Sequence, residues 1–325
     1  MSNLKRKEFK IPYFPGCTLK STAKNFEISA IKSAEKLGIK MVELPRWNCC
    51  GVVSSLASDD LMKHLAPVRN FIRVEEMNNA GLVDNEYRLL TLCSMCFNTL
   101  KRTNLRVKSD NEELKSINQF MYKEIDYHGN VKVIHFFELI KEIGFNTLKE
   151  EVTNPLKNLK IAPYYGCLLL RPKEVGIDSV ENPSVMEDFI SSLGAEPLID
   201  WEAKSRCCGS YHTVNNKNIV VNSIYGIIEN ARKFGADTII TSCPLCAFNL
   251  DKRQKEIIEN DNNFKPMPIL FFTQAMALAF GLNNKYLGFN SNYIDPEPLL
   301  IENNLLKITG LTRKKQRKEA NLNGK

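Results

Sequence analysis

Residues 90–98 read Leu-Thr-Leu-Cys-Ser-Met-Cys-Phe-Asn, and residues 240–249 read Ile-Thr-Ser-Cys-Pro-Leu-Cys-Ala-Phe-Asn. In both stretches a short run that favours a β-strand leads into a Cys-x-x-Cys pair and then an asparagine. The two pairs begin 150 residues apart, almost half of the 325-residue chain. Self-similarity at a fixed offset is typical of a duplicated unit, so the sequence predicts two related domains of about 150 residues.

The other cysteines follow the same repeat. Residues 11–17, Ile-Pro-Tyr-Phe-Pro-Gly-Cys, are echoed by residues 161–167, Ile-Ala-Pro-Tyr-Tyr-Gly-Cys, and a Cys-Cys-Gly motif follows in each half. All ten cysteines therefore fall into two sets of five: Cys17, Cys49, Cys50, Cys93 and Cys96 in the first half, and Cys167, Cys207, Cys208, Cys243 and Cys246 in the second.

Strands and helices are expected to alternate in each half. Apolar residues at helical spacing over 24–37 and a second helix over Ser58–Ala80 separate short apolar runs in the first half. This alternation predicts an α/β fold of two duplicated Rossmann-like domains, each a parallel sheet flanked by helices, related by a pseudo-two-fold axis. The expected strands are Phe9–Phe14, Ile39–Leu44, Tyr87–Leu92 and Val131–His135, then Leu159–Tyr165, Glu196–Ile199, Thr238–Thr241 and Pro268–Phe272.

The domain boundary is expected where Pro155 interrupts a charged helical stretch. We place the first domain at residues 1–153, the second at 154–308 and a basic C-terminal tail at 309–325. Each cysteine motif then follows the carboxyl end of a predicted strand, and open α/β sheets bind ligands beyond those ends. Five sulfur atoms can therefore converge in each half.

Composition and charge reduce the number of functional classes that fit the chain. The chain has 44 Lys+Arg against 37 Asp+Glu, but the excess lies in residues 1–10 and 313–325, so we expect solvated basic ends and no nucleic-acid partner. No apolar run follows the N-terminal charges, which predicts a cytoplasmic protein with reduced thiols. The uncharged stretch Pro266–Leu282 is expected to be a buried strand and helix rather than a membrane span, because prolines and polar residues interrupt it.

Five thiolates exceed what common metal sites need. A structural zinc ion takes four ligands, and a cubane [4Fe–4S] cluster also takes four cysteines. The side chains of two consecutive cysteines tend to point in different directions. Both members of a Cys-Cys pair can therefore ligate a cluster of several metal atoms more easily than one small ion. Thiolate-only ligation favours iron–sulfur or zinc over hard cations.

The twice-repeated pattern of a lone Cys, Cys-Cys-Gly and Cys-x-x-Cys resembles the tandem cysteine-rich CCG domains of the heterodisulfide reductase B subunits, over nearly all of residues 9–285. The resemblance implies that each half ligates a non-cubane [4Fe–4S] cluster through its five cysteines. It also implies that a disulfide is reduced, or thiols are oxidised, between the two clusters. No dinucleotide or Walker motif is present, so electrons are expected from partners, the iron–sulfur (C) and flavin (A) subunits of a heterodisulfide reductase-like complex.

Two features leave alternatives open. The 42 residues between Cys50 and Cys93 exceed the interval usual in that family, which predicts a longer helix or loop before Tyr87. Some related proteins are thought to hold zinc in the first domain, so a mixed occupancy is the alternative cofactor content. An electron-relay subunit of a lactate, glycolate or quinone-linked succinate or fumarate oxidoreductase, and a zinc-stabilised scaffold, are the competing functions.

A few other residues are candidates near the cysteines. His212 follows the second Cys-Cys-Gly, where it can protonate a leaving thiolate or bond the loop backbone. Arg46, Lys204 and Arg206 precede the two Cys-Cys pairs, where they can offset anionic clusters, hold an acidic substrate or remain solvated. Residues expected to serve structure are the loop-bonding or capping Asn98 and Asn249, the packing Trp47 and Trp201, and His64, His128 and His135, whose spacing is not that of metal ligands.

Overall fold

The computed structural model describes residues 8–52, 62–84 and 86–307. These residues form two four-stranded parallel sheets with equivalent strand order, β2-β1-β3-β4 and β6-β5-β7-β8. The strands of the first sheet are β1 (Phe9–Phe14), β2 (Ile39–Glu43), β3 (Arg88–Thr91) and β4 (Lys132–His135). Those of the second are β5 (Lys160–Tyr164), β6 (Glu196–Pro197), β7 (Thr238–Thr241) and β8 (Ile269–Phe271).

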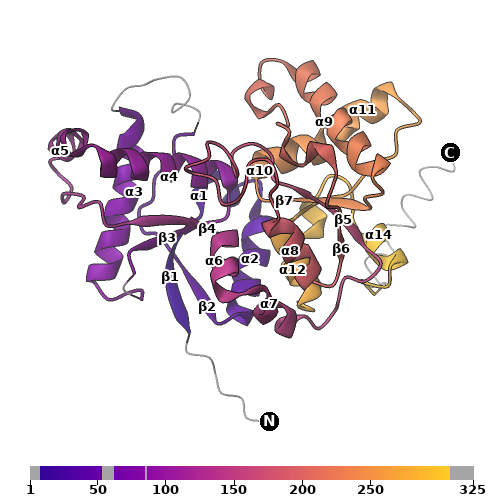
Figure 1. The fold of residues 1–325 in the computed structure, drawn as a ribbon, viewed down its shortest axis with the longest axis horizontal. Helices are drawn as coiled ribbons and strands as arrows, with labels where there is room; N and C mark the ends of the chain where they lie inside the picture. The colour runs from indigo at the N-terminus through magenta and orange to yellow at the C-terminus, as the bar shows by residue number, and fades with distance from the viewer. Residues whose placement is uncertain (1–7, 53–61, 85, 308–325) are drawn as a thin grey trace, which may run out of the picture.

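Helices flank both sheets (Figure 1). Those of the first half are α1 (Gly16–Leu19), α2 (Lys24–Lys36), α3 (Met62–Asn79), α4 (Ser94–Ser109), α5 (Asn111–Phe120), α6 (Phe136–Ile143) and α7 (Phe145–Glu151). Those of the second half are α8 (Val185–Ser192), α9 (Lys217–Lys233), α10 (Pro244–Ala247), α11 (Gln254–Asn260), α12 (Phe272–Ala279), α13 (Asn284–Leu287) and α14 (Glu297–Glu302). Short 3-10 helices span Glu202–Ser205, Ser210–His212 and Phe289–Ser291, and a π-helical turn spans Phe248–Lys252.

The predicted fold class is confirmed. Every expected strand is present, and each sheet is parallel throughout, with Phe9 of β1 opposite Ile39 of β2 and Leu90 of β3 opposite Ile134 of β4. Strands of a parallel sheet are buried on both faces and therefore consist of continuous apolar runs. These runs are what allowed the strands to be predicted from the sequence. The weakest element is β6, where only two residues of the predicted Glu196–Ile199 pair with β5.

The long interval between Cys50 and Cys93 has a simple explanation. Helix α3 has 18 residues and its counterpart α9 has 17. Eight residues separate α3 from β3, against four between α9 and β7, so part of the excess lies after the helix. The predicted start of this helix at residues 58–61 lies outside the described residues.

The two halves exchange helices across their interface. Helix α12 of the second half packs against α2 of the first, while α6 and α7 of the first half pack against α8 of the second. Figure 1 shows α2, α6, α8 and α12 gathered between the two sheets. This reciprocal packing confirms the predicted pseudo-two-fold relation. The boundary proposed at residues 153 and 154 remains a prediction.

An aromatic cluster fills that interface. Phe272, fully buried in α12, has its ring centroid 4.3 Å from Phe137 and 5.5 Å from Phe26, both in the first half. Phe26 also stacks on Phe271 at 4.2 Å. The stretch Pro266–Leu282 thus supplies β8 and α12 to the core, as expected. In the described part of the chain no helix is long and apolar enough to cross a membrane.

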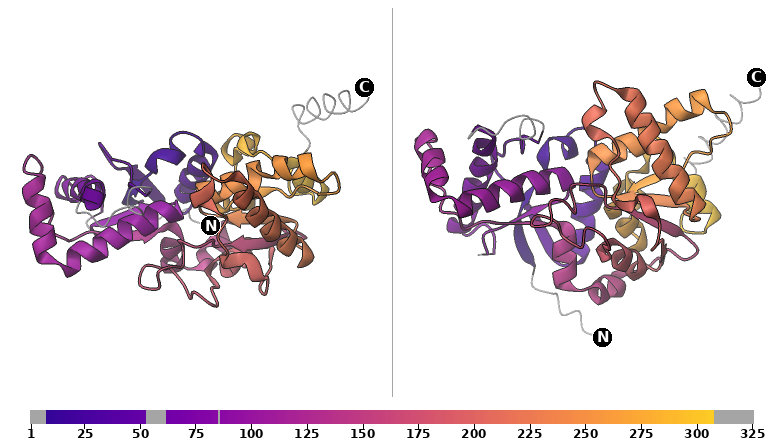
Figure 2. Two further views of the ribbon diagram at one scale, coloured as in Figure 1. Left: turned by 90° about the horizontal axis from the view of Figure 1, so that it is seen from above. Right: turned by 45° about the horizontal axis from the view of Figure 1, so that its top comes forward.

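One element breaks the symmetry. Helix α4 runs outward from the interface between the halves, and α5 lies at the end of the molecule remote from the second half (Figure 2). Asp110 begins α5 by accepting hydrogen bonds from the backbone amides of Glu112 and Glu113. In the second half the equivalent path after Cys246 is interrupted by the π-helical turn.

Candidate metal centre

Each cysteine motif lies beyond the carboxyl end of a strand, as predicted. Cys17 lies in α1, immediately after β1, and Cys93 is the N-cap residue of α4, two residues after β3 ends. Cys243 occupies the same N-cap position before α10, after β7. The parallel sheet brings these loops to one edge, because all its strands point the same way.

The five sulfur atoms of the first half meet. The Cys17 and Cys49 sulfur atoms are 3.9 Å apart, and those of Cys50 and Cys96 are 3.5 Å apart. Hydrogen bonds between Cys49 and Cys50 and between Cys93 and Cys96 complete a continuous chain of thiols. We call these five residues the first quintet.

The second half repeats this arrangement. The Cys208 and Cys246 sulfur atoms are 3.4 Å apart. Cys207 is hydrogen-bonded to both Cys167 and Cys208, and Cys243 to Cys246. We call these five residues the second quintet. Neither lone upstream cysteine faces away from its partners.

The two quintets also touch each other. The Cys93 thiol of the first is hydrogen-bonded to the Cys243 thiol of the second. Beside this contact the Ser94 and Ser242 hydroxyl oxygens are 2.6 Å apart, and the Ser94 amide donates to the Ser242 carbonyl at 3.2 Å. All ten thiols therefore form one connected group across the pseudo-two-fold interface.

Glycines at the flanks allow this crowding. Gly16 has φ +73°, and a Cβ atom there would lie 3.0 Å from the Cys96 sulfur; at Gly166, with φ +63°, it would lie 3.5 Å from the Cys246 sulfur. Gly51 and Gly209 of the Cys-Cys-Gly motifs also have positive φ, 77° in both. Only glycine enters this region of backbone conformation without strain.

Each quintet is open to solvent through equivalent cysteines. All ten cysteines are free thiols. In the first quintet Cys17 and Cys49 are exposed, and in the second their counterparts Cys167 and Cys207 are half-buried; the other six are buried. Each quintet thus presents its lone cysteine and the first member of its Cys-Cys pair toward solvent.

The thiols perturb one another strongly. Hydrogen bonds from Cys49 and Cys96 lower the pKa of Cys50 to about 4, while donation to Cys207 raises the pKa of Cys208 to about 12. Hydrogen bonds from Cys243 and Cys96 hold the pKa of Cys93 well below its usual range. Thiolates this close repel unless a cation compensates them, so the donor set suits a metal centre of several positive charges. Among the described residues, no three Cys, His, Asp or Glu side chains surround the position of a single ion.

Two asparagines fix the cysteine loops. Asn98 on α4 donates to the carbonyl oxygens of Leu168 at 2.8 Å and Arg171 at 2.6 Å, and so holds the loop of Cys167 in the other half. Asn249 donates to the Cys208 carbonyl at 3.4 Å and to the Thr213 hydroxyl at 3.1 Å. Both asparagines bond loops, one of the two structural roles expected for them.

Two of the candidate charged residues are held by carboxylates. Arg46 pairs with Glu76 at 2.9 Å, and Lys204 pairs with Glu187 at 3.0 Å. Arg206 and His212 are exposed. In the described part of the chain no hydrogen bond joins the His212 ring to a cysteine, and its role as a proton donor remains a prediction.

Two residues near the thiols had no such role in the sequence analysis. Tyr211, next to His212, has its pKa raised to about 12 by burial and by the charges of Cys167, Cys207 and Cys243. His135 is fully buried and donates from Nε2 to the Leu92 carbonyl, 2.8 Å away, directly before Cys93. The contact between His135 and Leu92 exists because β4 lies beside β3 in the sheet. Nothing in the local sequence around His135 indicates that contact.

Fold and site together define a class: duplicated α/β proteins whose two cysteine quintets meet at the domain interface. The chain belongs to the CCG cysteine-rich domain family, whose profile matches residues 11–101 and 161–251. The match covers both repeats, each from its first strand to just beyond its CxxC pair.

Relatives of this chain have several names. It is 33% identical to the 8-methylmenaquinol:fumarate reductase membrane anchor subunit of Wolinella succinogenes, over 90% of this chain and 99% of that one. It is 30% identical to the B subunit of a CoB-CoM heterodisulfide reductase from Methanosarcina acetivorans, over 88% of this chain and 94% of that one. A hypothetical protein from Helicobacter pylori has the same fold, with a TM-score of 0.68 at 14% identity, over 88% of this chain and 53% of that one.

Proposed function

We propose that this chain is the iron–sulfur subunit of a multi-subunit oxidoreductase, and that each quintet holds one non-cubane [4Fe–4S] cluster. The observation that carries the proposal is the convergence of all ten thiols into two quintets joined through Cys93 and Cys243. The names of the relatives, which include heterodisulfide reductase subunits, support the same class of function.

The donor set favours a cluster over a single ion. Zinc closes its coordination with four ligands, whereas each quintet offers five sulfurs, including both members of a Cys-Cys pair. Zinc in the first quintet with a cluster in the second is the alternative occupancy.

The proposed reaction is reduction of a disulfide, or its reverse, where the quintets meet. A disulfide takes up two electrons and two protons as its S–S bond breaks, and two thiols result. The clusters, when bound, supply these electrons one at a time. The chain's own contribution is to hold two redox sites side by side with open faces, so that the two sulfur atoms of one substrate can reach both. His212 stays our candidate for protonating a departing thiolate.

Electrons are proposed to come from two partners, the iron–sulfur (C) and flavin (A) subunits of a heterodisulfide reductase-like complex. The similarity to a fumarate reductase subunit favours a second candidate, a relay that passes electrons between a quinone-linked partner and a flavin protein. The two candidate functions make different predictions for an added thiol. A disulfide reductase requires the thiol to interact at the quintets, whereas an electron relay does not.

Metal analysis tests the occupancy. Protein purified without oxygen is expected to contain about eight irons and no zinc, against about four irons in the mixed form and none in a zinc scaffold. Cys50→Ser and Cys208→Ser are each expected to lose about half of the iron, because each removes one ligand of a different cluster. Ser94→Ala, in the same loop region, is the matched control and should keep the full amount. Full iron in both cysteine variants would contradict the ligand assignment.

A spectroscopic titration separates the two candidate functions. Oxidised protein mixed with a small thiol is expected to change its paramagnetic resonance signal, and the change should disappear in Cys208→Ser. A signal that ignores thiols, combined with co-purification of a quinone-linked partner, would select the relay.

A further inference from the structure

The asparagines that follow the two CxxC pairs stand at different distances from their cysteines. Asn98 comes two residues after Cys96, whereas Asn249 comes three residues after Cys246. The second half therefore has one residue more between its CxxC pair and its asparagine. The π-helical turn Phe248–Lys252 contains Asn249 and accommodates the additional residue. Single π-helical turns are found frequently at functional sites, so the two asparagines deserve comparison.

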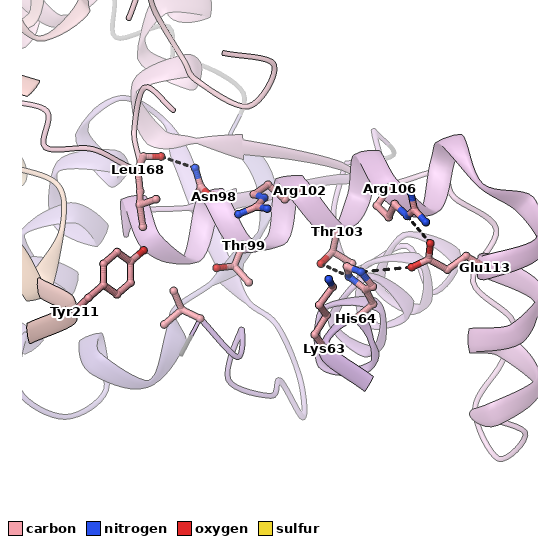
Figure 3. A pocket seen from close by; sticks show the side chains of 11 residues that line it. Lys63, His64, Asn98, Thr99, Arg102, Thr103, Arg106, Glu113, Leu168 and Tyr211 are labelled. Carbon is pink, nitrogen blue, oxygen red and sulfur yellow. Dashed lines mark hydrogen bonds and ion pairs between the residues drawn. The ribbon is translucent and has the colours of Figure 1, made fainter. Parts of the chain in front are cut away.

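Asn98 of the first half is directed at the second half. Its Nδ2 donates to the Leu168 carbonyl at 2.8 Å and to the Arg171 carbonyl at 2.6 Å. Figure 3 shows Asn98 with its bond to Leu168, beside Arg102, along the wall of a pocket of about 370 Å³. Both N–H groups of this amide are therefore used by the loop that follows Cys167, and neither remains for a sulfur atom of the first quintet.

Asn249 of the second half is directed at its own quintet. It is fully buried, and its Nδ2 lies 3.4 Å from the Cys208 carbonyl oxygen and 3.6 Å from the Cys208 sulfur. Successive residues of an α-helix are rotated by about 100° around its axis, so one additional residue turns a side chain toward a different neighbour. The insertion thus accounts for the different targets of the two asparagines.

The orientation of Asn249 is fixed by further contacts. The Thr213 hydroxyl, which accepts from the same amide, also donates to its Oδ1 at 3.2 Å. The Thr213 carbonyl in turn accepts from Arg253 at 3.2 Å, and Arg253 pairs with Glu256 at 2.8 Å. The equivalent arginine of the first half, Arg102, lies along the pocket wall instead. Only the second half therefore uses this arginine to hold the loop that orients its asparagine.

An N–H group that donates to a ligand sulfur affects the electron affinity of a metal centre. An added electron increases the negative charge on the sulfur ligands, so the hydrogen bond stabilises the reduced form more than the oxidised form and raises the reduction potential. The effect is strong where water is excluded, and Cys208 is buried. Solvent acts in the same direction on the first quintet through the exposed Cys17 and Cys49. The contribution of Asn249 is therefore measured by substitution, not by comparing the two centres.

We propose that Asn249 is a positioning residue that acts through the Cys208 sulfur and raises the reduction potential of the second metal centre, a role that its counterpart Asn98 does not share. The proposal rests on the proposed function and adds to it, because it makes the two centres non-equivalent through one inserted residue. A reductant of given strength then fills the second centre further than it would if Asn249 were turned away.

A potentiometric titration followed by paramagnetic resonance tests this proposal. The Cys50→Ser background leaves the second centre as the one to be measured, and each reduction adds one electron from dithionite without breaking a bond. Asn249→Ala is expected to lower the midpoint potential by about 59 mV, which is a tenfold change in a one-electron equilibrium constant. Asn249→Leu also lacks the N–H groups but refills the volume, and it should lower the midpoint equally. A shift in the alanine variant alone would assign the effect to packing and overturn the proposal.

The matched control is Asn98→Leu in the Cys208→Ser background. It removes the equivalent amide beside the first centre and should leave the midpoint of that centre unchanged; a shift as large as that of Asn249→Leu would overturn the proposal.

Iron analysis of the same samples separates this inference from the proposed function. Iron in the second quintet with an unchanged midpoint in Asn249→Leu would overturn the inference alone. A second quintet without iron would overturn the proposed function and the inference with it. The expected shift in a protein that turns over no disulfide would support the role of Asn249 and exclude the reaction.

Discussion

At the scale of single residues, two glycines determine how closely the backbone approaches sulfur. Gly16 precedes the lone cysteine of the first half, and a side chain there would press on the Cys96 sulfur at 3.0 Å. Its φ of +73° adds backbone strain to any substitution. The Gly-Cys sequence that repeats at Gly166 is therefore part of the candidate metal centre, although we assign no ligand role to glycine.

A substitution at Gly16 separates the strain of its backbone conformation from the crowding of the Cys96 sulfur. Gly16→Ala should lower the free energy of unfolding by about 1–2 kcal/mol through its backbone conformation, and should also reduce bound iron by about half because the Cys96 sulfur must shift. Gly81→Ala is the matched control, since Gly81 has φ +65° but nothing within 4 Å of its would-be Cβ atom. Urea unfolding and iron analysis of both variants check this. Equal iron in the two would show that the approach at Gly16 is not needed.

Residue-scale prediction from sequence succeeded for the cysteines' convergence and was incomplete for their neighbours. The motifs pointed to His212 as a proton donor near the second quintet, and that role remains a prediction. They gave no sign that the pKa of the neighbouring Tyr211 is raised by burial and by the charges of three cysteines. Both belong to the 3-10 helix Ser210–His212, in which successive side chains point about 120° apart. Adjacent positions in such a turn cannot be distinguished without its orientation.

At the scale of elements, His135 connects β4, α6 and the first CxxC loop. Its Nδ1 accepts from the Phe137 amide and begins α6, and its Nε2 donates to the Leu92 carbonyl at the end of β3. Burial lowers its pKa to about 3. The ring is therefore neutral in the folded protein at any physiological pH.

The protonation of His135 gives stability a pH dependence. Below its unfolded pKa of about 6.5 the unfolded chain takes up a proton that the folded chain refuses, so stability falls as pH falls toward 3, by about 1.4 kcal/mol per pH unit. His135→Asn keeps a capping oxygen and cannot titrate, so it should lose less stability than the parent between pH 7 and 5. Thermal midpoints at the two pH values measure this. His128→Asn, at a largely exposed ring, is the control; if it flattens the curve as much as His135→Asn, the assignment to His135 is wrong.

Most elements could be predicted because apolar runs and helical spacing are local signals. Phe9–Phe14 and Thr238–Thr241 match their predicted bounds. Strand β6 is shorter than predicted: Glu196 and Pro197 pair with β5, and only the Leu198 amide, which donates to the Ile161 carbonyl at 2.9 Å, continues the bonding. The extra residues before Cys93 could not be assigned to helix or loop. Helix length depends on where α3 packs, and this depends on residues far away in sequence.

At the scale of the whole molecule, the halves are expected to unfold as one unit. Phe272 of α12 touches rings of both halves, and the Ser29 hydroxyl on α2 is 2.7 Å from that of Thr273. Neither half can bury its helices alone, because α2 and α8 are each covered by helices of the other half. The sequence revealed the duplication but not this exchange, since an apolar helix face does not specify which sheet it will cover.

The two tryptophans of the chain report on this coupling. Trp47 lies in the first half and Trp201 in the second, so Trp47→Phe and Trp201→Phe each leave one fluorescent probe. Both variants are expected to show the same urea midpoint, and adding Phe272→Ala should lower both midpoints together, by about 3–5 kcal/mol of unfolding free energy. Separate midpoints, or a shift confined to the Trp201 probe, would show that the halves are independent.

The reciprocal packing of α12 on α2 and of α6 on α8 bears on ancestry. A surface that meets its own equivalent through a two-fold axis is self-complementary, so a single ancestral unit with these helices could have paired with an identical copy. Fusion of two genes would then have preserved the pairing while freeing each copy to change. The α5 arm of the first half is the kind of divergence that a homodimer, bound to keep its subunits alike, could not have evolved.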